Sequence, residues 1–178
     1  MHSCLRVGVP LFLLMVAASP LARPQASADA DTREVKAYRL TMPKVNAYYA
    51  ATKNLRKLAA TDPKACSAVE RDDENEGGSL NDQAKRIEAA YPKVIPLLKA
   101  DGLTVREFLL LTGVQLQAGM AVYAKSAGMK QLPADVNPEN VAFMEQHKKE
   151  LDAMNVELKK IPDPCKPSAE DEGSGDEQ

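Results

Sequence analysis

The sequence predicts an all-α protein, a compact bundle of about five to six helices around a central apolar helix at about residues 105–127, with one disulfide. Apolar residues recur three and four positions apart in long segments, which is the spacing of one helix face. Proline, glycine and Ser/Thr/Asp residues separate these segments, as they do at helix ends. No stretch alternates convincingly at a period of two, so strands are not expected.

Residues 1–28 are expected to be a signal peptide. Arg6 supplies a positive n-region, the run at 7–18 ("VGVPLFLLMVAA") is apolar, and "ASA", ending at Ala28, offers small residues for cleavage. "ADA", ending at Ala30, is an equally good cleavage site. The apolar run is shorter than the ~20 residues that span a bilayer. We therefore expect a periplasmic or secreted protein that is not membrane-spanning after leader removal.

The charge balance argues against a nucleic-acid partner. The whole chain has 23 basic and 25 acidic residues. Cleavage after Ala28 removes Arg6, Arg23 and no acids, which leaves 21 basic residues against 25 acidic ones. Five of those acids lie in the last ten residues, so the body of the protein is nearly neutral. It lacks the basic field that attracts nucleic acid or an anionic membrane.

Two cysteines remain after leader removal, Cys66 and Cys165. In an exported chain an even pair indicates a disulfide. A bond closing a loop of about 100 residues contributes on the order of 4 to 5 kcal/mol in the chain-entropy model. A redox pair or a metal–thiolate site is disfavoured, because there is no C-x-x-C motif and no second Cys or His near either residue in the sequence.

Residues 29–40 have few apolar positions and are expected to form an extended N-terminal arm. Thr41 is a good N-cap for the first long helix, at 42–60. Leu40 and Val45 are placed on either side of this cap for a hydrophobic staple. This helix is amphipathic, with its apolar residues on one face.

A short second helix is expected to follow. Asp62 and Pro63 form a cap followed by a first-turn proline, and the helix carries Cys66. The acidic run at 71–78 lacks the ligand spacing of a calcium loop, so it is interpreted as a solvated loop.

Two further helices precede the central one. Ser79 with Asp82 forms a loose capping box at the start of the first. Pro92 opens a second, shorter helix, which Pro96 bends and Gly102 ends.

The central helix begins at "TVRE" (104–107), a full capping-box match. Residues 108–124 carry no charge, and apolar side chains occur all round the helical wheel. Such a helix either spans a membrane or forms the centre of a bundle. Polar and small residues such as Gln115 and Gly119 favour the second, and Gly128 ends the helix.

Asn137 and Pro138 begin the last helix, which is expected to run unbroken to about Ile161 and to complete a helical domain at 41–165. The acidic, apolar-poor tail at 166–178 is expected to be disordered.

His147 is the one histidine that remains after leader removal. On an unbroken helix, with about 100° per residue, it falls inside an apolar stripe and faces the core. Its neighbours in that stripe include Phe143, Met144, Leu151 and Met154.

Three interpretations of His147 are open at this stage. It is a core histidine bonded to a buried group such as Thr112 or Gln115, an axial haem ligand paired with a methionine such as Met144, or part of a non-haem metal site. There is no C-x-x-C-H motif for covalent haem attachment. A di-iron bundle needs Glu-x-x-His twice, and position 144 is methionine, so no metal site is expected.

No catalytic residue is expected. There is no G-x-S-x-G motif and no phosphate-binding glycine loop, and no pair of carboxylates has the spacing of a general acid and base. Thr112, Gln115 and Gly119 lie on one narrow strip of the central helix. This strip either lets another helix approach closely or lines a pocket for an apolar ligand with Thr112 and Gln115 as polar anchors.

Three segments, "LTMPKVNAYYAATKNL", "GLTVREFLLLTGVQLQAGMA" and "NPENVAFMEQHKKEL", make the chain similar to a family of uncharacterised secreted bacterial proteins with the P-E-N-V-A-F pattern. The resemblance covers most of residues 40–155. It implies export and an all-helical domain. It implies no activity, so it assigns no catalytic residue.

The sequence thus predicts an exported, non-enzymatic helical protein that acts as a binding or protein-interaction module, without a cofactor. The alternative is a small apolar ligand or haem bound in the bundle core. His147, Met144, Thr112 and Gln115 would then be the binding residues.

Overall fold

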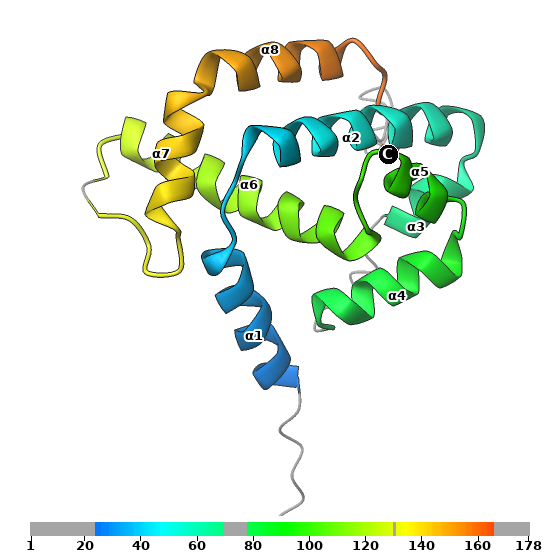
Figure 1. Cartoon of the computed structure of the whole chain (residues 1–178), viewed down its shortest axis with the longest axis horizontal. Coiled ribbons are helices and arrows are strands. Elements are labelled where there is room, and N and C mark those ends of the chain that lie inside the picture. The colour runs from blue at the N-terminus through cyan, green and yellow to red at the C-terminus, as the bar shows by residue number, and fades with distance from the viewer. Residues whose placement is uncertain (1–23, 70–77, 130, 166–178) are drawn as a thin grey trace, which may run out of the picture.

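The computed structural model describes residues 24–69, 78–129 and 131–165 (Figure 1). Within these ranges the chain is all-helical, with no strand, and the Cys66–Cys165 disulfide is present. Both predictions are therefore confirmed. The helices are α1 (Pro24–Ala37), α2 (Met42–Thr61), α3 (Lys64–Val69), α4 (Leu80–Ala90), α5 (Val94–Ala100), α6 (Val105–Ser126), α7 (Pro138–Gln146) and α8 (Lys148–Lys159).

Helix α6 is the central helix, as its apolar sequence predicts. It packs against α1, α2, α4, α5 and α7. Leu111 and Val114 of α6 are buried with Val45 of α2 and Leu98 of α5 in the main core. A second, smaller cluster lies where α7 crosses the later part of α6, and its buried members are Ala121, Val136 and Val141.

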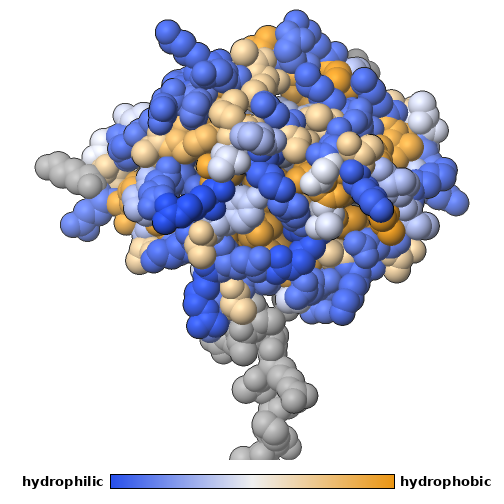
Figure 2. Space-filling model, viewed as in Figure 1, coloured by the Kyte–Doolittle hydropathy of each residue, from blue (hydrophilic) through white to orange (hydrophobic). Residues whose placement is uncertain are grey.

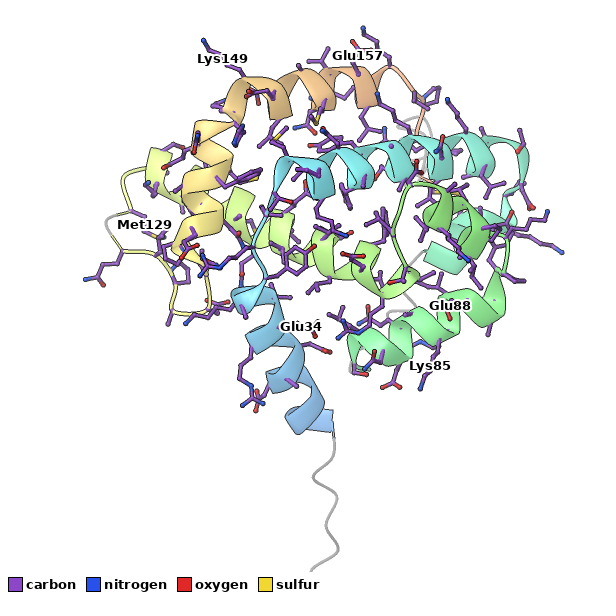
Figure 3. All side chains as sticks on the ribbon, in the orientation of Figure 1. Glu34, Lys85, Glu88, Met129, Lys149 and Glu157 are labelled. Atoms are coloured by element: carbon purple, nitrogen blue, oxygen red, sulfur yellow. A yellow bond between two sulfur atoms is a disulfide. The ribbon has the colours of Figure 1, made fainter. Side chains whose placement is uncertain are left out.

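The prediction of an extended arm at 29–40 is wrong, because most of this segment belongs to α1. Distant contacts dock that helix. Asp31 accepts the Leu80 backbone N–H at 2.7 Å, and Glu34 accepts two hydrogen bonds from Arg106 at 2.7 and 2.5 Å. Figure 3 shows Glu34 on the side of α1 toward α4 and α6. These polar contacts hold α1 together with the packing of Val35 against the core.

The last helix is divided, so the expectation of one helix from 138 to about 161 is also wrong. His147 ends α7 and precedes α8, with φ −100° and ψ 19°. In Figure 1, α7 lies across α6, while α8 turns away and runs beside α2. On the α2 side, Arg56 donates to the carbonyl oxygens of Leu158 and Ile161 at 2.9 and 3.2 Å, which holds the end of α8 in this direction.

The predicted helix starts agree with the structure, but not every predicted cap bond forms. Ser79 and Asp82 form both halves of a capping box. The Thr104 side chain accepts the Glu107 N–H, and the Asn137 side chain accepts the Glu139 N–H. Thr41 makes no side-chain cap bond.

Within the described ranges, no helix combines the length and hydropathy that crossing a membrane requires. The predicted apolar run of the leader, most of the acidic loop at 71–78 and the acidic tail at 166–178 lie outside the described residues.

Candidate functional site

His147 lies at the corner between α7 and α8, at the edge of the fold. Its side chain is 24% exposed, and its Nδ1 is 3.7 Å from a carboxylate oxygen of Glu150. Its ring centroid is 4.6 Å from that of Phe143. His147 is therefore partly buried against Phe143 and not enclosed in the core as on an unbroken helix, because the chain leaves the helical path at this residue.

Met144 lies one turn before His147 and packs against α6. Its terminal methyl group is 3.7 Å from the position that a Cβ at Gly119 would occupy. This is ordinary van der Waals contact, so Met144 covers the surface that the glycine leaves bare. The methionine is thus part of the packing between α7 and α6.

Thr112 and Gln115 make their hydrogen bonds mainly to their own helix. The Thr112 hydroxyl donates to the Phe108 carbonyl at 2.9 Å and lies 3.4 Å from the Tyr48 hydroxyl. The Gln115 amide donates to the Leu111 carbonyl at 3.4 Å. Of the four residues predicted as a binding set, Met144 lies against Gly119, one helical turn from Gln115, while Thr112 faces α2 and His147 stacks on Phe143 at the end of α7.

Gln115 does border a shallow apolar hollow of about 500 Å³ on the outer side of α6. Three large apolar side chains stand along it. Leu116 is 57% exposed, Met120 64% and Tyr123 74%. We call these three residues the open face of α6. Gly119 and Ala124 also line the hollow.

The open face is not predicted from the sequence, because a helix with apolar residues on every side is expected to be covered by other helices on every side. One signal was available. Leu116, Met120 and Tyr123 are spaced by four and three residues, on the side of α6 opposite Leu111, Val114 and Ala118.

A second hollow lies between α1, α4 and the loop before α7, and it is more polar. Asp31 and Asp135 both line it. Both carboxylates already have partners, since Asp31 accepts the Leu80 N–H and Asp135 accepts a hydrogen bond from Gln117 at 3.1 Å. Among the described residues, no group of three or more His, Cys, Asp or Glu side chains could hold a metal ion.

The buried amides of the "NPEN" motif have a structural role that the sequence did not reveal. Asn140 donates to the Tyr38 carbonyl at 2.8 Å and accepts the Leu40 N–H at 2.9 Å. Asn137 donates to the Lys36 carbonyl at 2.8 Å. We call Asn137 and Asn140 the asparagine clamp, because together they bind the backbone that joins α1 to α2.

The resolved pKa shifts do not indicate acid–base catalysis. Hydrogen bonds from Lys93 and Tyr91 lower the pKa of Asp62 to about 2. Burial, together with the nearby Glu107 carboxylate, raises the pKa of Tyr38 to about 12. Both shifts move the group further from neutral pH, whereas a catalytic acid or base needs a pKa near it.

Comparison with protein-family models, with curated proteins and with solved structures finds no match for this chain. The resemblance to secreted bacterial proteins therefore stays a prediction.

Proposed function

We propose that the protein is a non-enzymatic protein-interaction module that docks a helix of a protein partner on the open face of α6. The carrying observation is that Leu116, Met120 and Tyr123 are each more than half exposed on the helix that otherwise forms the core. Single exposed apolar residues are ordinary, but a contiguous row indicates an interaction site.

The shape of this surface suits a helix. Anchors at i, i+4 and i+7 are the pattern by which amphipathic helices bind in grooves. The hollow beside Gly119 gives an approaching side chain somewhere to insert. Methionine adapts its shape to different partners, and tyrosine is enriched at interfaces. Figure 2 shows how hydrophobic residues reach the surface between hydrophilic ones on one side of the molecule.

Export to the periplasm or beyond is part of the proposal. The Cys66–Cys165 disulfide supports it, because such bonds persist in oxidising compartments. The predicted leader supports it independently.

The test is a pull-down from envelope extract with the purified protein as bait. The informative variant replaces the open face by serines (L116S/M120S/Y123S). The matched control is Val156→Ser on α8, where an apolar side chain is also 55% exposed. We expect partner proteins to be enriched by the wild-type protein and by the control, and lost with the triple variant. Equal enrichment by all three baits would overturn the proposal, and circular dichroism verifies that each bait is folded.

The alternative, an apolar ligand or haem bound through His147 and Met144, has weaker geometric support. Neither of the two hollows described above is lined by either residue. Protein purified from the periplasm would show a Soret band if haem were bound, and His147→Ala would abolish it.

A further inference from the structure

We infer that the Cys66–Cys165 disulfide is a redox-sensitive latch, which holds α8 against α2, and that α8 swings away about a hinge at His147 when the bond is reduced. The inference goes beyond the proposed function, because it concerns α8 and the segment after it and not the open face of α6. Three features of this region support it: the shallow packing of α8, the way in which its end is attached, and the break in the helical path before it.

Helix α8 has little packing of its own. Of its 12 described residues, only Leu151 is buried, and Met154 is partly buried against the main core. A polar contact to α2 comes from the Tyr49 hydroxyl, which donates to the Asn155 side chain at 2.8 Å. An isolated helix of this length is marginal in water. The position of α8 therefore depends on what holds its two ends.

The segment 160–165, which we call the strap, attaches the end of α8 to the body of the protein at two places. Arg56 of α2 pairs with Asp163 at 3.2 Å, in addition to its hydrogen bonds to the carbonyl groups at the end of α8. Cys165 is bonded covalently to Cys66 of α3, which packs against α2 and α4. The contacts of Arg56 open and close reversibly, so the disulfide is the anchor that keeps the strap in place.

The other end of α8 already has a joint. His147 ends α7 with φ −100° and ψ 19°, and the chain changes direction there (Figure 1). Helix α7 stays attached without α8, because Asn140 belongs to the asparagine clamp and Val141 is buried in the second cluster. A rotation of the backbone at His147 can therefore move α8 while α7 keeps its place.

Reduction should release α8 without unfolding the rest of the protein. Among the described residues, α8 is the last helix, so no later helix rests on it. It contributes one buried residue, Leu151, to the main core. The fully buried side chains of that core come from α2, α5 and α6, and they are Val45, Leu98, Leu111 and Val114. Weakly packed units of this kind open locally at a lower free energy than the whole fold.

The chemistry is thiol–disulfide exchange with a dithiol reductant. A thiolate of the reductant attacks one sulfur of the Cys66–Cys165 bond, forms a mixed disulfide and releases the other cysteine as a thiolate, which takes up a proton. The second thiolate of the reductant then displaces the first cysteine, so the protein gains two thiols and the reductant one disulfide. Both cysteines are only partly buried. They need no C-x-x-C motif, because they are the substrate of the exchange and not its catalyst.

The latch makes the position of α8 depend on the compartment. Thiols stay reduced in the cytosol, whereas disulfides form and persist after export. Helix α8 therefore docks when the protein reaches an oxidising compartment. In the reduced protein, Tyr49 and the side of α2 beside it become accessible.

The test is hydrogen exchange of the purified protein before and after reduction with dithiothreitol. The amides of α8 should exchange at least about tenfold faster after reduction, a small part of what a disulfide across a long loop contributes. Those of α4 and α6 should change little. The double variant Cys66→Ser/Cys165→Ser should match the reduced protein without any reductant. Adding dithiothreitol to this variant is the matched control and should change nothing.

Limited digestion with trypsin gives a second measurement, which uses the wild-type protein alone. Figure 3 shows Lys149 on α8 and Lys85 on α4, and both side chains are exposed. Reduction should speed cleavage after Lys149 at least about tenfold and leave cleavage after Lys85 unchanged, because a protease cuts a helix only where it opens.

Two results would overturn the inference. If α8 keeps its protection after reduction, its noncovalent contacts suffice and the disulfide is no latch. If α4, α6 and α8 all lose protection by the same factor, the disulfide stabilises the whole fold and no local opening occurs.

Discussion

The two halves of α6 have similar composition and opposite surroundings. The first half, with Leu111 and Val114, is enclosed by α1, α2, α4 and α5. The second half packs mainly against α7, and this leaves Leu116, Met120 and Tyr123 exposed. An apolar sequence therefore does not by itself determine which residues of α6 are buried. Burial depends on which neighbouring helices cover each part of α6.

The largest expected effect is on the free energy of unfolding, and it is found by comparing a substitution in the enclosed half of α6 with one in the open half. Leu111 is fully buried, so Leu111→Ala should lower the free energy of unfolding by about 2–5 kcal/mol through lost contacts and a cavity. Met120→Ala should change it by no more than about 0.5 kcal/mol, because the side chain is already in water. Urea unfolding of both variants measures the difference. Equal losses would mean that the open face is buried in the native protein.

The asparagine clamp should have the next largest effect, because it fixes α1 beside the enclosed half. Asn140→Ala leaves the Tyr38 carbonyl and the Leu40 N–H without their partner. Leaving buried polar groups unpaired costs about 1–3 kcal/mol. Hydrogen exchange should show faster exchange at Leu40, with α4 and α5 little changed. Asn46→Ala, at an exposed position of α2, serves as the control.

A substitution at Gly119 is expected to have a smaller effect of the opposite sign, an increase in the free energy of unfolding. A Cβ there meets Met144 at an ordinary contact distance of 3.7 Å. Gly119→Ala should therefore stabilise the fold by about 0.5–1 kcal/mol through helix propensity. It should also partly fill the hollow beside Met120. Thermal unfolding measures the stabilisation, and a destabilised variant would show that α6 and α7 tolerate no closer approach.

The smallest expected effect is on the stability of the fold at acid pH. The folded pKa of Asp62 is lowered to about 2 by its hydrogen bonds from Lys93 and Tyr91. A lowered carboxylate pKa stabilises the fold above the unfolded pKa, near 4, and this stabilisation is lost as the pH falls toward 2. Urea midpoints measured at falling pH should thus decline less steeply in Asp62→Asn than in the wild-type protein. Parallel curves would exclude this contribution.

The sequence predicted the features that depend on local chemistry. Ser79, Thr104 and Asn137 cap helices because their side chains reach N–H groups two or three residues away. The disulfide was predictable because Cys66 and Cys165 were the only two cysteines outside the expected leader.

Features that depend on distant residues were not predictable. Helix α1 is docked by Leu80 and Arg106, which lie far along the chain. The helical wheel placed His147 in the core because it assumes a straight helix, while the contacts of Arg56 direct α8 elsewhere.

The asparagine clamp also bears on the order in which parts of the protein can fold. Asn140 and its partners Leu40 and Tyr38 are separated by 100 and 102 residues, and the disulfide joins positions 99 apart. Because a ribosome delivers the chain from its N-terminus, the backbone between α1 and α2 lacks the hydrogen bonds of the asparagine clamp until Asn140 has been made. Contacts of such long range form slowly.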